Sequence, residues 1–333
     1  MSDLPLCRAG DSLPLARYRF TLQAEAPLHL PAYPGSMLRG SLGHGLRAVS
    51  CITRQKSCDG CPLLSACQYP ALFQPRPTPA MATRFPDIPA PYVLEVPLGT
   101  PTTLAPGDRF KFEMVLFGPA LPQLGTLILA WQRAAWQGLG KGQARATLSQ
   151  VEWEQAPGQW QIVYTPETGS VLPHRARVVL PDLPPDKGSV TLNLATPTRL
   201  QHHGQLCNSS QLTAAIVLRA LERKVSLYAH CYLGALPATP AADSLDMATL
   251  ETNTHLYQWQ RYSNRQQQRM SMDGLVGSLT LQGPLASWLP WLWLGQYTHL
   301  GKNTSFGLGR YRLPSSTLHY QDLPTTTGER QHE

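Results

Sequence analysis

One predicted order of strands and helices occurs twice along this chain, and it restricts the possible folds more than any other feature. In the first half, alternation of apolar and polar residues predicts strands over residues 16–24, 92–96, 108–117 and 146–155. Helical spacing predicts one helix after Ser36, whose side chain can cap it, and another over residues 121–137. The resulting order is β-α-β-β-α-β, as in the ferredoxin-like fold.

The second half repeats this order after a segment rich in proline and aspartate. It predicts helices over residues 209–227 and 285–296, and strands over residues 189–195, 262–270, 275–281 and 306–313. We therefore predict an α+β protein with two ferredoxin-like, RRM-like domains in tandem. The expected bounds are residues 1–164 and 189–318 for the domains, 165–188 for the linker and 319–333 for a flexible tail.

The charge balance favours a polyanionic partner. The chain has 28 Lys and Arg against 21 Asp and Glu, which gives a net charge of +7, so nucleic acid is the first candidate. The N-terminus lacks a cationic start followed by an apolar stretch, and the longest apolar run, 284–294, is too short to cross a bilayer. We expect a cytoplasmic protein with no membrane contact.

Four cysteines lie within 17 residues, directly after the first predicted helix. Their spacing is Cys51-x6-Cys58-x2-Cys61-x5-Cys67. Four thiolates suffice for a tetrahedral structural zinc, which we favour, and which would stabilise a loop too polar to fold alone. The spacing also suits an iron–sulfur cluster, and four free thiols are the third possibility. We expect a metal-binding insertion over residues 51–67 of the first domain.

A glycine-rich segment precedes the last predicted strand. A strand and not a helix follows it, so it is not a nucleotide-binding P-loop. Its glycines let a ligand backbone approach closely, and its polar side chains supply donors, so a nucleic-acid backbone is a natural ligand. A plain turn is the alternative. The candidate RNA-binding residues are Gly301, Lys302, Asn303, Gly307, Gly309 and Arg310.

A second candidate RNA-binding segment, residues 259–266, mixes aromatic, arginine and amide side chains without an acid. Such side chains stack on unpaired bases and contact phosphates, so Arg261 and Arg265 are candidates. A solvated edge strand is the alternative.

The first helix carries the strongest candidate for proton transfer. On a helical wheel Gly40, His44 and Arg47 lie opposite the apolar stripe, so His44 should face solvent or a ligand. Histidine titrates near neutral pH and suits proton transfer. Gly40, Gly43 and Gly45 are unfavourable in a helix, so we expect a bulky partner to approach this surface.

These motifs together resemble a known family. Residues 38–47 with the four cysteines, and residues 261–266, 274–277 and 297–311, resemble the CRISPR-associated precursor-crRNA processing endoribonucleases of the RAMP superfamily. The resemblance extends in order over about residues 16 to 313. It implies two ferredoxin-like domains in tandem and a CRISPR repeat RNA as substrate.

The resemblance also implies a chemistry that requires no metal or other cofactor. The ribose 2′-hydroxyl attacks the adjacent phosphate, which leaves a 2′,3′-cyclic phosphate and a 5′-hydroxyl. His44 matches the family's first-helix histidine and is the expected general acid or base. Arg47 and Arg39 could stabilise the phosphate, with Tyr33 as a weaker catalytic candidate.

Two other functions remain open at this stage. The chain could be a non-catalytic subunit that holds crRNA among other subunits of a CRISPR effector complex. A weaker alternative is an iron–sulfur redox or DNA-processing protein, although the chain has no recognisable nuclease or nucleotide signature of that kind.

Overall fold

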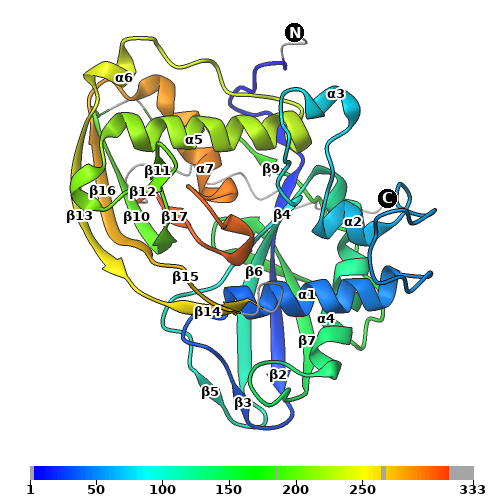
Figure 1. Ribbon diagram of the computed structural model, residues 1–333. Coiled ribbons are helices and arrows are strands. Elements are labelled where there is room, and N and C mark those ends of the chain that lie inside the picture. Colours follow the sequence, from blue (N-terminus) through cyan, green and yellow to red (C-terminus); the bar gives the residue numbers. More distant parts are fainter. Residues whose placement is uncertain (1–3, 185–186, 264–267, 315–333) are drawn as a thin grey trace, which may run out of the picture.

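The computed structural model describes residues 4–184, 187–263 and 268–314, in which two antiparallel sheets form the frame of the molecule (Figure 1). The larger sheet has five strands in the order β4-β6-β2-β7-β8. The bounds of its strands are Leu15–Ala24 (β2), Tyr92–Glu95 (β4), Arg109–Phe117 (β6), Ala146–Ala156 (β7) and Gln159–Tyr164 (β8). Four of them confirm predicted strands. The fifth, β8, was not predicted and forms a hairpin with β7.

Two helices cover one face of this sheet. They are α1 (Gly35–Ser50) and α4 (Leu124–Gln137), and α4 continues from a 3-10 turn over Gly118–Gln123. They pack against each other in front of the sheet (Figure 1). In the core between helix and sheet, the Trp131 ring of α4 lies 4.6 Å from the Phe112 ring of β6. Both predicted helices are confirmed.

The smaller sheet has four strands in the order β13-β16-β10-β17. The bounds of its strands are Ser189–Thr198 (β10), Thr249–Tyr257 (β13), Gly274–Gln282 (β16) and Tyr311–Arg312 (β17). The strand predicted over residues 262–270 corresponds in part to β14 (Gln260–Ser263) and β15 (Gln268–Ser271), which pair with each other. Its expected place in the sheet is taken by β13, which pairs along its whole length with β16. Most β13 side chains are exposed, so the strand lacks the apolar alternation that reveals strands in sequence.

The helices of the second half are α5 (Ala214–Tyr228) and α7 (Leu289–Thr298). The helix predicted from residue 209 begins at Ala214, because the Thr213 hydroxyl accepts the Ile216 N–H and caps it there. The final predicted strand is also shorter than expected, because Thr304–Phe306 forms a 3-10 turn. None of the helices in the described ranges is both long and apolar enough to span a bilayer.

The remaining elements are short. Four two-stranded pairs join β1 to β9, β3 to β5, β11 to β12 and β14 to β15. The bounds of these strands and of the short helices are Ser12–Leu13 (β1), Leu28–His29 (β3), Gln68–Phe73 (α2), Pro79–Ala82 (α3), Thr103–Leu104 (β5), Val178–Val179 (β9), Gln201–His202 (β11), Gln205–Leu206 (β12), Ser244–Met247 (α6), Gln260–Ser263 (β14) and Gln268–Ser271 (β15). The predicted linker at 165–188 contains β9, and the predicted domain bounds remain a prediction.

Each sheet has its own apolar core, and the two cores exchange a few side chains. Leu308 of the glycine-rich segment is buried in the first core, whereas Val93 and Phe117 of the larger sheet are buried in the second. The last part of the chain therefore packs against both halves. This packing brings the glycine-rich segment to the start of α1.

Candidate functional site

The glycine-rich segment and the first helix form one site. The Tyr33 hydroxyl, just before α1, donates a hydrogen bond of 3.1 Å to the Phe306 carbonyl oxygen. A side chain at Gly35, the first residue of α1, would overlap the same carbonyl group. A side chain at Gly307 would lie 2.6 Å from the Tyr33 hydroxyl. Small residues on both sides thus allow this close approach.

The glycines of the segment are required by the conformation of its own backbone. Gly301, Gly307 and Gly309 have φ values of +84°, +85° and +77°, which side chains rarely adopt. A side chain at Gly309 would also overlap the Leu300 carbonyl group. The side chains that this backbone presents to solvent are those of Lys302 and Asn303. Of the predicted RNA-binding residues in the segment, these two are placed to meet a ligand.

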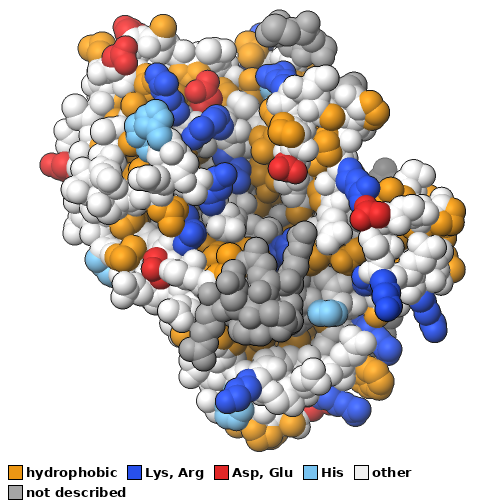
Figure 2. Space-filling view, in the orientation of Figure 1, with side chains coloured by type: hydrophobic (Ala, Val, Ile, Leu, Met, Phe, Trp, Pro, Cys, Tyr) orange, Lys and Arg blue, Asp and Glu red, His pale blue; other side chains and the backbone are white. Residues whose placement is uncertain are grey.

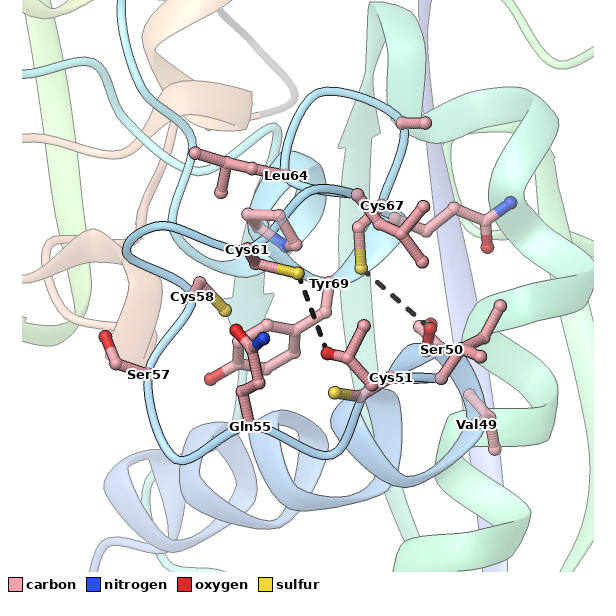
Figure 3. Close-up of a pocket in the computed structure, with 16 residues that line it drawn as sticks. Val49, Ser50, Cys51, Gln55, Ser57, Cys58, Cys61, Leu64, Cys67 and Tyr69 are labelled. Carbon is pink, nitrogen blue, oxygen red and sulfur yellow. Dashed lines mark hydrogen bonds between the residues drawn. The ribbon is translucent and has the colours of Figure 1, made fainter.

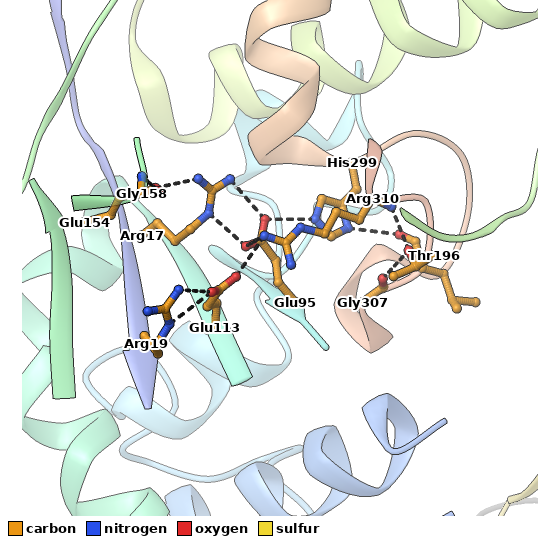
Figure 4. Close-up of polar contacts among 11 residues, drawn as sticks. Arg17, Arg19, Glu95, Glu113, Glu154, Gly158, Thr196, His299, Gly307 and Arg310 are labelled. Atoms are coloured by element: carbon orange, nitrogen blue, oxygen red, sulfur yellow. Dashed lines mark hydrogen bonds and ion pairs between the residues drawn. The ribbon is translucent and has the colours of Figure 1, made fainter. Parts of the chain in front are cut away.

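Arg310 is placed differently from the prediction. Its side chain is buried, and its guanidinium lies 2.8 Å from Glu113 Oε2 and 3.1 Å from Glu95 Oε2 (Figure 4). A guanidinium paired with two carboxylates inside the protein is not available to a phosphate. We therefore correct the expectation that Arg310 binds RNA and assign it to the junction between the two sheets.

Glu95 is the centre of this buried cluster of charges. It accepts hydrogen bonds from Arg17 Nε at 2.8 Å and lies 3.2 Å from His299 Nε2. Burial opposes its ionisation, but the charges of Arg17 and Arg310 outweigh burial and hold the pKa of Glu95 well below its usual value. The sequence did not predict this cluster: isolated charges in apolar strands, such as Arg17 and Glu95, were a signal for buried charges but not for their partners.

His44 lies on the open side of α1. It is exposed, as is Gly40 one turn earlier, where an added side chain would have nothing within 4 Å. The other two glycines are needed for close packing. A side chain at Gly43 would overlap the Phe73 ring, and a side chain at Gly45 would overlap the Ala130 carbonyl group of α4. The expectation that all three glycines leave room for a ligand is therefore corrected to Gly40 alone.

Arg39 lines a pocket beside the glycine-rich segment. Its guanidinium carbon lies 4.3 Å from the Phe73 ring centre and 5.2 Å from that of Phe306. The pocket has a volume of about 640 Å³ and is lined by Arg39, Phe73, Gln74, Pro75, Ile88, Pro89, Ala90 and Ser305. A cation stacked on aromatic rings at the edge of an open pocket suits a nucleobase or a phosphate.

Arg47 is turned towards the cysteine loop. Its guanidinium donates to the carbonyl oxygens of Gln55 and, at 3.0 Å, of Lys56. It lies three residues after His44 on α1, and residues at that spacing are neighbours on a helix surface. Arg47 therefore connects the end of α1 to the loop that carries the cysteines.

The four cysteines line one pocket of about 370 Å³, and their thiol groups surround it (Figure 3). The Cys61 sulfur lies 3.6 Å from the Thr53 hydroxyl, and the Cys67 thiol donates to the Ser50 carbonyl oxygen at 3.9 Å. Within the described ranges, no three metal-binding side chains converge as they would around a bound ion. The metal site stays a prediction.

Of the two arginines in the second predicted segment, only one lies within the described residues. Arg261 lies in β14, where its backbone pairs with Met270, and Arg265 lies outside the described residues. The start of this segment adjoins the site, because the ring of Trp259 packs 5.0 Å from that of Tyr33. The β14–β15 hairpin therefore begins beside the contact between α1 and the glycine-rich segment.

Two family models match this sequence. Residues 13–176 match AF_1859_N, described as an N-terminal domain, and residues 192–311 match the CRISPR-associated endoribonuclease Cas6. The second match includes the glycine-rich segment. No curated protein matches the sequence.

Several solved structures share this fold over most of the chain. Thermus thermophilus Cas6 (TTHB231) is 16% identical, with 92% of this chain and 100% of that chain covered and a TM-score of 0.50. The Cas6 (TTHB231) product complex gives 15% identity, coverage of 90% and 99%, and a TM-score of 0.52. A partial Cas6-RT-Cas1–Cas2 complex gives 14% identity, coverage of 93% and 47%, and a TM-score of 0.50.

Proposed function

Because this chain is a protein of the Cas6/RAMP type, we propose that it binds CRISPR repeat RNA and cuts it beside helix α1. The main support for this proposal is the contact between the start of α1 and the glycine-rich segment, in which the Tyr33 hydroxyl donates to the Phe306 carbonyl oxygen. This contact brings the helix that carries His44 together with the loop that presents Lys302. In this proposal the proton-exchanging group and the phosphate-binding loop act on the same RNA strand.

The strand orders support a tandem of two ferredoxin-like units. In each sheet the first strand of its unit lies between the third and the fourth, and the second strand is at the edge beside the third. This is the order that a β-α-β-β-α-β unit of the ferredoxin-like type requires. The strand orders do not bear on the metal-binding insertion.

The proposed reaction uses side chains of this chain alone. The 2′-hydroxyl of the RNA attacks the adjacent phosphorus while the bond to the 5′ oxygen breaks, which yields a 2′,3′-cyclic phosphate and a 5′-hydroxyl. His44 exchanges a proton with one of these two oxygens and water exchanges a proton with the other, so the proton lost from the 2′-hydroxyl is balanced by the one gained at the 5′ oxygen. Arg39 and Lys302 supply positive charge to the phosphate, and Tyr33 holds the loop in place.

Incubation with the repeat RNA of its own CRISPR locus tests this function. We expect site-specific cleavage that persists in EDTA and gives fragments with 2′,3′-cyclic phosphate and 5′-hydroxyl ends, seen by mass spectrometry. Binding without cleavage at any pH would instead indicate a crRNA-holding subunit. Failure to bind repeat RNA would contradict the proposal.

The non-catalytic alternative has one observation in its favour. Arg310 is paired with two carboxylates and Arg47 donates to the cysteine loop, so of the two arginines expected to support His44 only Arg39 lines an open pocket. A subunit of this kind would need protein partners, and one structure with a similar fold is a Cas6 joined to reverse transcriptase, Cas1 and Cas2. The cleavage assay separates the two functions.

We further propose that the four cysteines hold a structural zinc, with an iron–sulfur cluster as the alternative. Four thiols around one pocket are the donor set of such a site. Through Arg47, the bound loop would fix the end of α1. The double variant Cys58→Ser/Cys61→Ser is expected to lose metal, measured by mass spectrometry, together with several degrees of melting temperature. Metal loss without a change in melting temperature would contradict a structural role.

A further inference from the structure

Lys224 lies behind the glycine-rich segment and has no acidic partner. It projects from α5, and its Nζ is 3.5 Å from the hydroxyl oxygen of Thr304 at the start of the 3-10 turn. The residue is partly buried. Within the described part of the chain, no carboxylate lies at ion-pair distance from it. An ammonium that is partly withdrawn from water and has no counter-charge would be stabilised by a bound anion.

The groups around Lys224 add positive charge. Lys302, the exposed lysine of the glycine-rich segment, is close enough to repel it. Tyr228, one turn further along α5, shares the contact with the Thr304 hydroxyl, and Tyr92 of β4 and Cys231 lie near Tyr228. Burial raises the pKa of both phenols, so they are neutral. Lys302 is therefore the charged group that Lys224 faces.

The surface around this pair is basic. Figure 2 shows Lys and Arg side chains gathered over α5 and beside it, with few acidic ones between them. The exposed cations of α5 are Arg219 and Arg223. A surface of this kind attracts a polyanion, and Lys224 lies on the same helix as these two arginines.

We propose that Lys224 and Lys302 together bind one phosphate of the RNA backbone, and that Lys224 takes up a proton from solution as the phosphate binds. The inference rests on the proposed function for the presence of RNA, and it adds a binding residue that sits outside α1 and outside the glycine-rich segment. The Thr304 hydroxyl, 3.5 Å from Lys224 Nζ, helps to aim the ammonium group.

The proton uptake follows from the surroundings of the amine. Burial and the charge of Lys302 lower the pKa of free Lys224 to about 8, so a large part of it is neutral in mildly basic solution. A bound phosphate favours the ammonium form and returns its pKa towards the usual range. Binding should then take up a fraction of a proton, and this fraction should rise from pH 7 to pH 9.

Calorimetric titration of the full chain with its repeat RNA, in two buffers of different ionisation enthalpy, counts these protons. The parent protein is expected to show uptake that rises from pH 7 to pH 9. Lys224→Arg keeps the charge but cannot lose it, so affinity should stay within about threefold while the rise in uptake disappears. Lys224→Met should lose the uptake and also reduce the salt slope of binding by about one.

The exposed lysine of β6, Lys111, provides a matched control. Lys111→Met should leave the uptake profile unchanged. If Lys224→Arg and Lys224→Met both keep the uptake of the parent protein, Lys224 does not bind phosphate. If the parent protein does not bind RNA, the proposed function fails. Acetylation mapped by mass spectrometry gives a second readout, because RNA should protect Lys224 and Lys302 but leave Lys111 reactive.

Discussion

Single buried charges determine how the two halves of this protein are held together. Glu95 is fully buried and faces Arg17 from the first half and Arg310 and His299 from the second. A buried carboxylate in such a place stabilises the fold only while its partners remain, because each unpaired charge would be costly. The partners are up to about 200 residues apart in sequence, so no local pattern could have predicted them.

Substitution of Glu95→Gln should therefore destabilise the protein strongly. We expect the free energy of unfolding, measured by urea denaturation at pH 7, to fall by about 3–5 kcal/mol. The partly exposed Glu154, which also contacts Arg17, is the control, and Glu154→Gln should cost much less. Equal losses for the two variants would contradict the central place of Glu95.

The pH dependence of the parent protein should follow from the same residue. The pKa of folded Glu95 lies well below its usual value of 4.5, so its contribution to stability is complete above that value. The contribution is lost as the pH falls through the lower, folded pKa. The stability difference between the parent protein and Glu95→Gln should therefore shrink in acid.

The buried position of the Tyr33 side chain could not be predicted from the sequence. The resemblance placed it among catalytic candidates, but its hydroxyl is buried against the Phe306 carbonyl group, and burial raises the pKa of Tyr33 far above neutrality. Tyr33→Phe should cost about 1 kcal/mol of stability and reduce single-turnover cleavage less than tenfold. A loss of a hundredfold or more with normal RNA affinity would restore Tyr33 to a catalytic role.

At the scale of elements, helix α1 shows what periodicity can and cannot predict. The wheel placed Gly40 and His44 on the open side correctly, because a helix bound to one sheet has a fixed inner face. It could not tell why Gly43 and Gly45 are small, since the neighbours that require this, Phe73 and α4, come from other elements. Strand β13 was missed for the related reason that pairing with β16, and not burial, defines it.

Two alanine substitutions in α1 should have opposite effects. Gly45→Ala would push a side chain into the Ala130 carbonyl group of α4 and should lower stability by about 1–3 kcal/mol. Gly40→Ala has open space and should raise stability by about 0.5–1 kcal/mol, because alanine favours the helix. Thermal denaturation of the two variants measures both effects, and a loss in Gly40→Ala would mean that this surface is covered.

For the whole molecule, the repeated element order predicted a mixed fold of helices and antiparallel sheets, but the candidate site forms only where the two halves meet. The glycine-rich segment belongs to the second half by sequence, yet Leu308 is buried in the first core and Phe306 contacts Tyr33. The sequence could not show which charges of the predicted segments face inward. Lys302 faces solvent and Arg310 does not, although both lie in one glycine-rich stretch.

We propose that His44 transfers a proton to or from RNA held between α1 and the glycine-rich segment. The most direct test compares His44→Ala with the parent protein in RNA affinity and in single-turnover cleavage of repeat RNA. We predict an affinity within about threefold, because one neutral side chain adds little to a many-contact interface, and cleavage at least about a hundredfold slower. Cleavage at the parent rate by His44→Ala would contradict the proton-transfer role proposed for His44.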